Sequence, residues 1–269
     1  MNGTADSPSP VDAFNQVTTG YYRSSVPQVA AQALRHMLSL VAETAPEDVG
    51  RLVSLLYLFH RIARLSEEAH TLFGSILRDY GGPHKEVVRA ILKARDDGSS
   101  PNALELKVEG PQHLDLLWAE FFVTGSPDPI IHIAGVLDWD DRVRWHLDRW
   151  LHAWSVFGGA GRRATAATLR EVGLPVDLAT KTIVTDADLD CLCCSIAERR
   201  FPIFKHLPFT MPPEDLLALG TKGAALWSLR LNSTEHARVA EICLAERDRA
   251  GGAARRRLTE SIEGKPVAR

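Results

Sequence analysis

The sequence predicts an all-α protein, an irregular stack of antiparallel helical hairpins that is α-solenoid-like. Three observations support this. Apolar residues recur at helical spacing along most of the chain, whereas no persuasive β-alternation is present. The breaks between these stretches are short, so we expect about ten to twelve helices with antiparallel neighbours. No fixed sequence period emerges, which disfavours a regular tetratricopeptide array.

The N-terminal half begins with residues 1–10, whose serines and prolines predict a disordered lead-in. Proline and acidic residues favour the first turn of a helix, and Pro27 and Pro46-Glu-Asp stand where two helices should start. Ser66-Glu-Glu starts another, which should stop at Gly81-Gly-Pro83. An N-terminal helical bundle is thus expected over 11–95, with helices at about 11–23, from 27, 49–65, 66–80 and 84–95.

Residues 96–112 are the clearest loop, and they divide this bundle from a C-terminal helical-hairpin unit over 113–249. Leu104 to Val108 alternates in polarity, but it has no partner strand and is interpreted as coil. Asn232-Ser233 separates the last two expected helices, and residues 250–269 are expected to form a flexible tail. The expected helices of this half are about 111–124, 127–137, 138–157, 162–172, 186–199, 213–231 and 234–249.

Composition and charge exclude some classes of function. The 269 residues are 45% hydrophobic and 24% charged, as in an ordinary globular protein, and the net charge of -3 disfavours nucleic-acid binding. Apolar runs such as Leu52 to Phe59 fall far short of the roughly 20 residues that span a membrane. The N-terminus lacks the pattern of a secretory signal, so we expect a cytoplasmic protein. The excess of Arg over Lys, together with abundant Ala, Leu and Gly, suggests a GC-rich bacterial genome.

Four of the six tryptophans lie within residues 139–154. On a helix, Trp139, Val143, Leu147, Trp150 and Trp154 share one face, whereas Asp141, Trp145, Asp148 and His152 lie on the opposite one. Aromatic residues on both faces predict that this helix contacts protein, or a ligand, twice. We therefore expect a scaffold or accessory protein that binds a protein or peptide partner around 138–157. The expected contact residues are Trp145, Arg149, Asp141, Asp148 and His152.

An alternative is a metal-dependent enzyme of small-molecule or peptide biosynthesis, which would use His and Asp residues of 132–152. Asp148 and His152 are four residues apart on one helix face, and with His132 they are candidate ligands of a divalent transition metal. A ladder of surface ion pairs explains the same spacing, and no HExxH motif is present. The sequence therefore identifies no catalytic residue, and no cofactor is expected outside the metal alternative. It leaves open whether the protein is an enzyme and what its oligomeric state is.

Three of the four cysteines, Cys191, Cys193 and Cys194, lie within four residues, and the fourth is Cys243. This spacing suits neither a disulfide framework nor a paired CxxC zinc site. Free cysteines usually pack as small apolar groups, which is the preferred interpretation here. A redox or copper site remains the alternative.

Two stretches have a recognisable pattern: His113-Leu-Asp-Leu-Leu-Trp-Ala-Glu-Phe-Phe-Val-Thr-Gly125 with 129–137, and Ala224-Ala-Leu-Trp-Ser-Leu229 with 236–239. They resemble segments of an uncharacterised bacterial all-helical family, loosely labelled tetratricopeptide-like. The resemblance covers under a quarter of the chain and implies an α-hairpin stack without an activity. It also implies that Trp118, Phe121, Phe122 and Trp227 are core aromatic residues and that Gly125 ends a helix.

Overall fold

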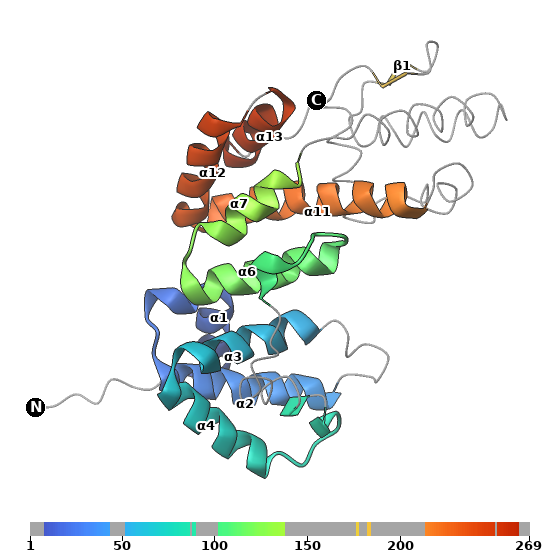
Figure 1. Ribbon diagram of the computed structural model, residues 1–269. Helices are drawn as coiled ribbons and strands as arrows, with labels where there is room; N and C mark the ends of the chain where they lie inside the picture. Colours follow the sequence, from blue (N-terminus) through green and yellow to red (C-terminus); the bar gives the residue numbers. More distant parts are fainter. Residues whose placement is uncertain are drawn as a thin grey trace, which may run out of the picture. The chain divides into compact units, whose positions relative to one another are not determined.

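The computed structural model describes residues 8–43, 52–86, 88–89, 102–137, 176–177, 182–183, 213–250 and 252–263. These residues are helical or in loops, apart from one pair of two-residue strands, which confirms the all-α class (Figure 1). In that pair, β1 (Val176–Asp177) runs antiparallel to β2 (Thr182–Ile183). The chain divides into two compact units: unit 1 holds residues 1–106 and 115–129, and unit 2 holds 107–114 and 130–269.

Unit 1 is built on helices whose starts follow the capping rules. Ser9 caps α1 by accepting a hydrogen bond from the Asp12 amide, and Ser66 caps α4 by accepting one from the Ala69 amide. The start of α4 matches the sequence prediction, whereas α1 and its Ser9 cap begin just inside the predicted disordered lead-in. The elements are α1 (Pro10–Gly20), the 3-10 turn η1 (Tyr21–Arg23), α2 (Pro27–Glu43), α3 (Val53–Leu65), α4 (Glu67–Asp79), η3 (Ala103–Glu105) and most of α6 (Pro111–Thr124).

The core of unit 1 lies between α1, α2, α3 and α4. Helix α2 packs against the other three, and α3 packs against α4 (Figure 1). The Phe59 ring of α3 meets the Phe73 ring of α4 edge to face at 5.8 Å. Helix α2 buries apolar residues that recur at helical spacing, whereas Val29 of the same pattern is half-buried; the buried ones include Ala30, Ala33, Leu34, Met37, Leu38 and Val41.

Unit 2 contains three helices that pack against one another, α11 (Pro213–Glu235), α12 (Ala237–Arg249) and α13 (Gly252–Glu263). It also contains most of α7 (Asp128–Gly135). Val239, Ile242 and Cys243 of α12 are buried, as are Leu258 and Ser261 of α13. The sequence predicted a flexible tail over 250–269, but α13 occupies much of that range because Leu258 supplies an apolar anchor.

The break between the last two helices falls at His236, so the prediction of a break at Asn232-Ser233 is wrong. Asn232 donates a side-chain hydrogen bond to the Ser228 carbonyl, 2.9 Å away, and Thr234 donates one to the Leu231 carbonyl, 2.6 Å away. Polar side chains that bond back to their own helix are compatible with its continuation. His236 instead adopts an extended backbone and ends the helical run.

Two more of the predicted helices are present, and the predicted loop contains a short helical turn. The helix predicted over 111–124 is α6, and the one predicted over 127–137 is α7 in a shorter form. Residues 106–109 form no strand, and Ala103–Glu105 form a 3-10 turn in the predicted loop. The helices predicted over 138–157, 162–172 and 186–199 lie outside the described residues. Among the helices that the structure describes, none combines the length and the apolar character needed to cross a membrane.

Candidate functional site

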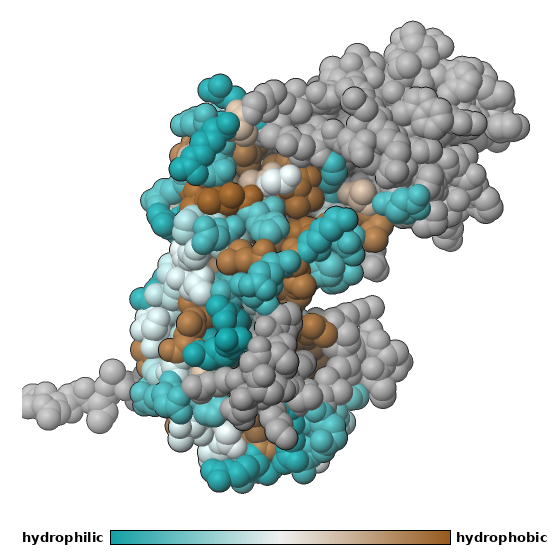
Figure 2. Space-filling model, in the orientation of Figure 1, coloured by the Kyte–Doolittle hydropathy of each residue, from teal (hydrophilic) through white to brown (hydrophobic). Residues whose placement is uncertain are grey.

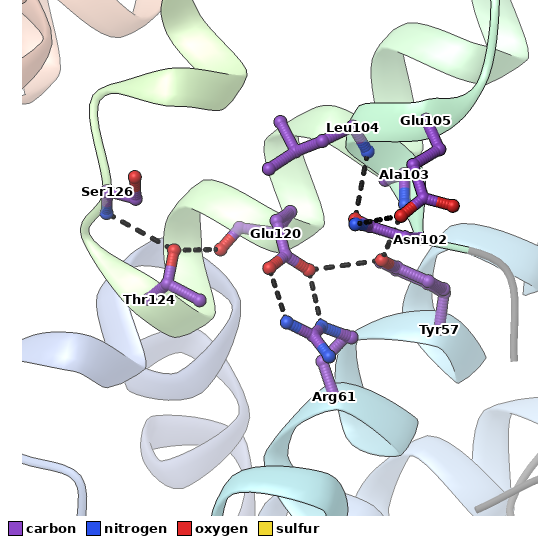
Figure 3. Close-up of polar contacts among 9 residues, drawn as sticks. All are labelled: Tyr57, Arg61, Asn102, Ala103, Leu104, Glu105, Glu120, Thr124 and Ser126. Carbon is purple, nitrogen blue, oxygen red and sulfur yellow. Dashed lines mark hydrogen bonds and ion pairs between the residues drawn. The ribbon is translucent and has the colours of Figure 1, made fainter. Parts of the chain in front are cut away.

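The main polar cluster of unit 1 centres on Glu120, a carboxylate in the apolar face of α6. Its neighbours Ala119 and Phe121 are buried, and Glu120 itself is 3% exposed. A buried carboxylate is costly unless it is paired and hydrogen-bonded. The groups that satisfy Glu120 come from α3 and η3, which are distant in the sequence (Figure 3).

Arg61 of α3 holds Glu120 with two parallel hydrogen bonds. Its Nε lies 2.5 Å from Oε2 of Glu120, and its Nη2 lies 2.6 Å from Oε1. This bidentate arrangement is the strongest pairing of arginine with a carboxylate, because both donors and both acceptors are used (Figure 3). Arg61 and Tyr57 are four residues apart, so α3 presents both of them on one face.

Tyr57 links this ion pair to the backbone of η3. Its hydroxyl donates to Oε2 of Glu120 at 3.0 Å and accepts a hydrogen bond from the Ala103 amide at 3.2 Å. Asn102 caps the same turn by accepting a hydrogen bond from the Leu104 amide. The cluster of Tyr57, Arg61 and Glu120, here called the Glu120 network, therefore joins α3, η3 and α6.

The electrostatics of the Glu120 network keep Tyr57 and Arg61 in fixed protonation states at neutral pH. Burial raises the pKa of Tyr57 to about 12, and the Glu120 carboxylate adds to the rise. The hydrogen bond to Glu120 raises the pKa of Arg61. Tyr57 thus stays a hydroxyl donor and Arg61 stays a cation. Because these groups satisfy one another, the geometry supports a structural role better than acid–base catalysis.

The end of α6 is fixed next to this network. Thr124 donates its hydroxyl to the Glu120 carbonyl at 2.8 Å and accepts a hydrogen bond from the Ser126 amide at 3.2 Å (Figure 3). Gly125 has φ +65°, and its amide donates to the Phe121 carbonyl at 2.8 Å. A Cβ at Gly125 would lie 2.7 Å from Cδ2 of Tyr22. Gly125 therefore ends the helix, as the resemblance implied.

The aromatic residues of the resemblance divide into buried and exposed ones. Trp118 is 6% exposed and Phe121 is fully buried, as expected for core residues, whereas Phe122 is half-buried. The expectation for Trp227 is wrong, because it is 42% exposed. Helix α11 has apolar residues on all sides, so its sequence does not show which of its faces is buried.

Trp227 belongs to an apolar line along α11 that faces solvent. Leu217 is 46% exposed and Leu231 is 41% exposed, and the spacing of 217, 224, 227 and 231 places these residues on one helix face. In Figure 2, hydrophobic residues interrupt the hydrophilic surface in the band where α7 and α11 lie. We call this line the α11 seam; it consists of Leu217, Gly220, Ala224, Trp227, Leu231 and Thr234.

The small residues of the α11 seam lie between its large ones. Gly220 and Ala224 separate Leu217 from Trp227, and a Cβ at Gly220 would have no atom within 4 Å. The single chain therefore leaves space at Gly220 beside exposed leucine and tryptophan side chains. Exposed apolar residues that gather on one face, unlike scattered ones, are typical of a contact surface.

Cys243 of α12 is the cysteine that the structure describes. It is fully buried, and Ser233 donates its hydroxyl to the sulfur at 3.8 Å. Burial raises the pKa of the Cys243 thiol to about 11, so the thiol stays protonated at neutral pH. Cys243 thus packs as a core residue. Cys191, Cys193 and Cys194 lie outside the described residues.

The predicted partner-binding residues, Trp145, Arg149, Asp141, Asp148 and His152, also lie outside the described residues. Of the alternative metal ligands, His132 is placed, and it is half-buried in α7. In the described part of the chain, no three His, Cys, Asp or Glu side chains come together as a metal site would require.

Sequence reasoning missed both the Glu120 network and the α11 seam. The one available signal for the network was Glu120, a carboxylate within the apolar run Leu116 to Val123. Its partners lie 59 and 63 residues away in the sequence, so no local spacing reveals them. No family model, curated protein or solved structure matches the chain. The function therefore has to be argued from the residues of this molecule.

Proposed function

We propose that this protein is a helical scaffold that binds a protein or peptide partner through the α11 seam. The observation that carries the proposal is the exposure of Leu217, Trp227 and Leu231 on one face of α11. Removing apolar surface from water is the main favourable contribution to most protein association. Tryptophan is also among the residues that most often dominate the binding energy of an interface.

An amphipathic helix is the type of partner that suits the α11 seam best. A straight helix presents a narrow apolar line, and a second helix covers such a line with residues spaced three and four apart. The space at Gly220 would accept a large side chain of the partner helix. The proposal keeps the α-solenoid-like stack and the cytoplasmic location predicted from the sequence, and it moves the partner surface from 138–157 to α11.

The Glu120 network supports a binding role over a catalytic one, because its charged groups are bonded to each other. The Glu120 side chain is 4% exposed and the Arg61 side chain is 19% exposed, and they are bonded to each other. A substrate would have to displace these bonds to react there. The alternative of a metal-dependent enzyme depends on Asp148 and His152 together with His132, and no observation on the described residues favours it.

Affinity capture with matched baits tests the proposal. The wild-type chain is compared with Leu231→Lys, which places a charge in the α11 seam, and with Leu65→Lys, which changes a leucine of unit 1 that is 57% exposed. Circular dichroism confirms that each bait is folded. We expect a protein that binds the wild type and Leu65→Lys but is lost with Leu231→Lys, and that binds again in titrations of the purified pair. Equal capture by all three baits would refute the proposal.

A further inference from the structure

Arg230 of α11 carries a guanidinium with one edge that is buried and unsatisfied. Its Nε and Nη2 atoms have almost no exposed surface, and among the described residues neither atom has a hydrogen-bond partner. Leu226, four residues earlier, and Ser233, three residues later, are buried on the same side of the helix, which accounts for the burial. An arginine side chain is always charged, and a buried charge without a partner is costly. Native proteins seldom leave such donors unused.

Helix α12, which packs against α11, offers Arg230 no free carboxylate. Its three acidic residues are each paired with an arginine of the same helix. The pairs are Arg238 with Glu241 at 3.3 Å, Arg247 with Asp248 at 2.9 Å and Arg249 with Glu246 at 2.7 Å. The charges of α12 are therefore balanced within that helix, and the guanidinium of Arg230 is left outside this balance.

Arg61 of the same chain shows what this edge of a guanidinium can hold. Its Nε and Nη2 atoms donate to the two carboxylate oxygens of Glu120, at 2.5 Å and 2.6 Å (Figure 3). In Arg230 the two nitrogen atoms without a partner are the same pair, Nε and Nη2. These two donors are parallel, and their spacing matches two oxygens of a carboxylate or a phosphate group.

We propose that Arg230 is an oxyanion-binding site, in which Nε and Nη2 hold two oxygens of a carboxylate or phosphate group of a ligand. Such charge-assisted hydrogen bonds are about twice as strong as neutral ones, and a bidentate pair adds geometric specificity. The Arg230 side chain as a whole is half-buried, so it is not sealed from solvent. The site lies beside buried positions of α11, and it does not depend on what binds the α11 seam.

Replacing Arg230 by methionine separates ligand binding from a purely structural role. In the absence of an oxyanion, Arg230→Met removes a buried charge that has no partner, so the variant should be at least as stable as the wild type. With an oxyanion bound the order should reverse, because a ligand that binds only the folded chain stabilises it as its concentration rises. Arg230→Lys keeps the charge but lacks the paired donors, so it should lose most of the response.

Thermal melts followed by circular dichroism measure this response in a chloride buffer, to which inorganic phosphate or acetate is added at constant ionic strength. The melting temperature of the wild type should rise by roughly 2–4 °C more than that of Arg230→Met. Phosphate also stabilises proteins in general, so the control is Arg238→Met, which removes an exposed arginine of α12 and should respond like the wild type. A response to phosphate alone assigns the site to phosphate groups, and a response to acetate alone assigns it to carboxylates.

Two results would overturn the inference. The first is an equal response of the wild type and Arg230→Met to both anions. The second is an Arg230→Met variant that is less stable than the wild type in the chloride buffer, because the chain itself would then supply the partner of Arg230. Neither result bears on the proposed function, which the capture experiment with Leu231→Lys tests separately.

Discussion

Removing Arg61 while keeping Glu120 should be among the most destabilising single changes in unit 1. Arg61→Met keeps the length of the side chain but deletes the cation and both hydrogen bonds to the carboxylate. Glu120, whose side chain is 4% exposed, then keeps the Tyr57 hydroxyl as its donor. A buried charge that loses its partner costs about 3–5 kcal/mol of unfolding free energy. We expect about 3 kcal/mol, because Arg61 is 19% exposed and water can replace part of what it supplies.

A second substitution should then restore stability. Glu120→Gln removes the stranded charge and keeps an oxygen that accepts from Tyr57, so Arg61→Met/Glu120→Gln should be more stable than Arg61→Met alone. A buried amide that is imperfectly paired still costs about 1–2 kcal/mol, and the expected rescue is therefore about 1–2 kcal/mol. Such a rescue reflects coupling between the two sites, which a double-mutant cycle measures.

Urea unfolding followed by circular dichroism gives these free energies, and hydrogen exchange of α6 amides assigns the change to unit 1. The control is Arg238→Met, which breaks an exposed pair with Glu241 on α12. Pairs in which both side chains are exposed contribute little, so this variant should match the wild type within error. If Arg61→Met behaves like Arg238→Met, or if the double variant is less stable than Arg61→Met, the ion pair does not hold α3 and α6 together as argued.

Three further predictions concern Tyr57, Gly125 and Cys243. The pKa of Tyr57 is near 10 in the unfolded chain and about 12 in the folded one, so the stability that the protonated Tyr57 contributes is complete below pH 10 and is lost as the pH rises towards 12. Urea titrations at several pH values should show a smaller loss for Tyr57→Phe than for the wild type. In thermal melts, Gly125→Ala should lower the unfolding free energy by about 1–2 kcal/mol because Gly125 has a positive φ, and by more if Tyr22 cannot move. Gly74→Ala should instead raise the unfolding free energy slightly, because alanine favours a helix more than glycine does. Cys243 should react with a thiol reagent, as followed by peptide mass spectrometry, only after unfolding, and fast labelling of the folded chain would contradict its burial.

The sequence predicted those elements that local chemistry determines. Helix α2 starts at Pro27, as predicted, and α4 starts after the Ser66 cap. These features depend on residues within one or two turns of each other. Gly125 was also predicted correctly, from the resemblance, because a helix that ends in the left-handed region favours glycine.

Features that depend on distant residues could not be predicted in this way. Glu120 is held by side chains of α3, and the helical spacing of α6 gives no sign of them. The seam was missed for a different reason: α11 is apolar all round, so Trp227 fits a buried face as well as an exposed one. Among the described helices, α12 and α13 pack against α11, and this packing, which the sequence of α11 does not reveal, buries some of its faces and leaves Trp227 exposed.

The energetically unfavourable groups of unit 1 are satisfied within the chain, whereas those of unit 2 are not. In unit 1 a carboxylate, a guanidinium and a phenol turn inward and satisfy one another, which fixes α3, η3 and α6 and leaves little reactive surface. In unit 2 the large apolar side chains of the α11 seam are 41% to 46% exposed, and the part of their surface that faces water does not stabilise the single chain. Apolar exposure of this kind is unfavourable until a partner covers it. If substitution of Trp227 or Leu231 by a polar residue left both the oligomeric state and every contact with other proteins unchanged, no binding role would remain for the seam.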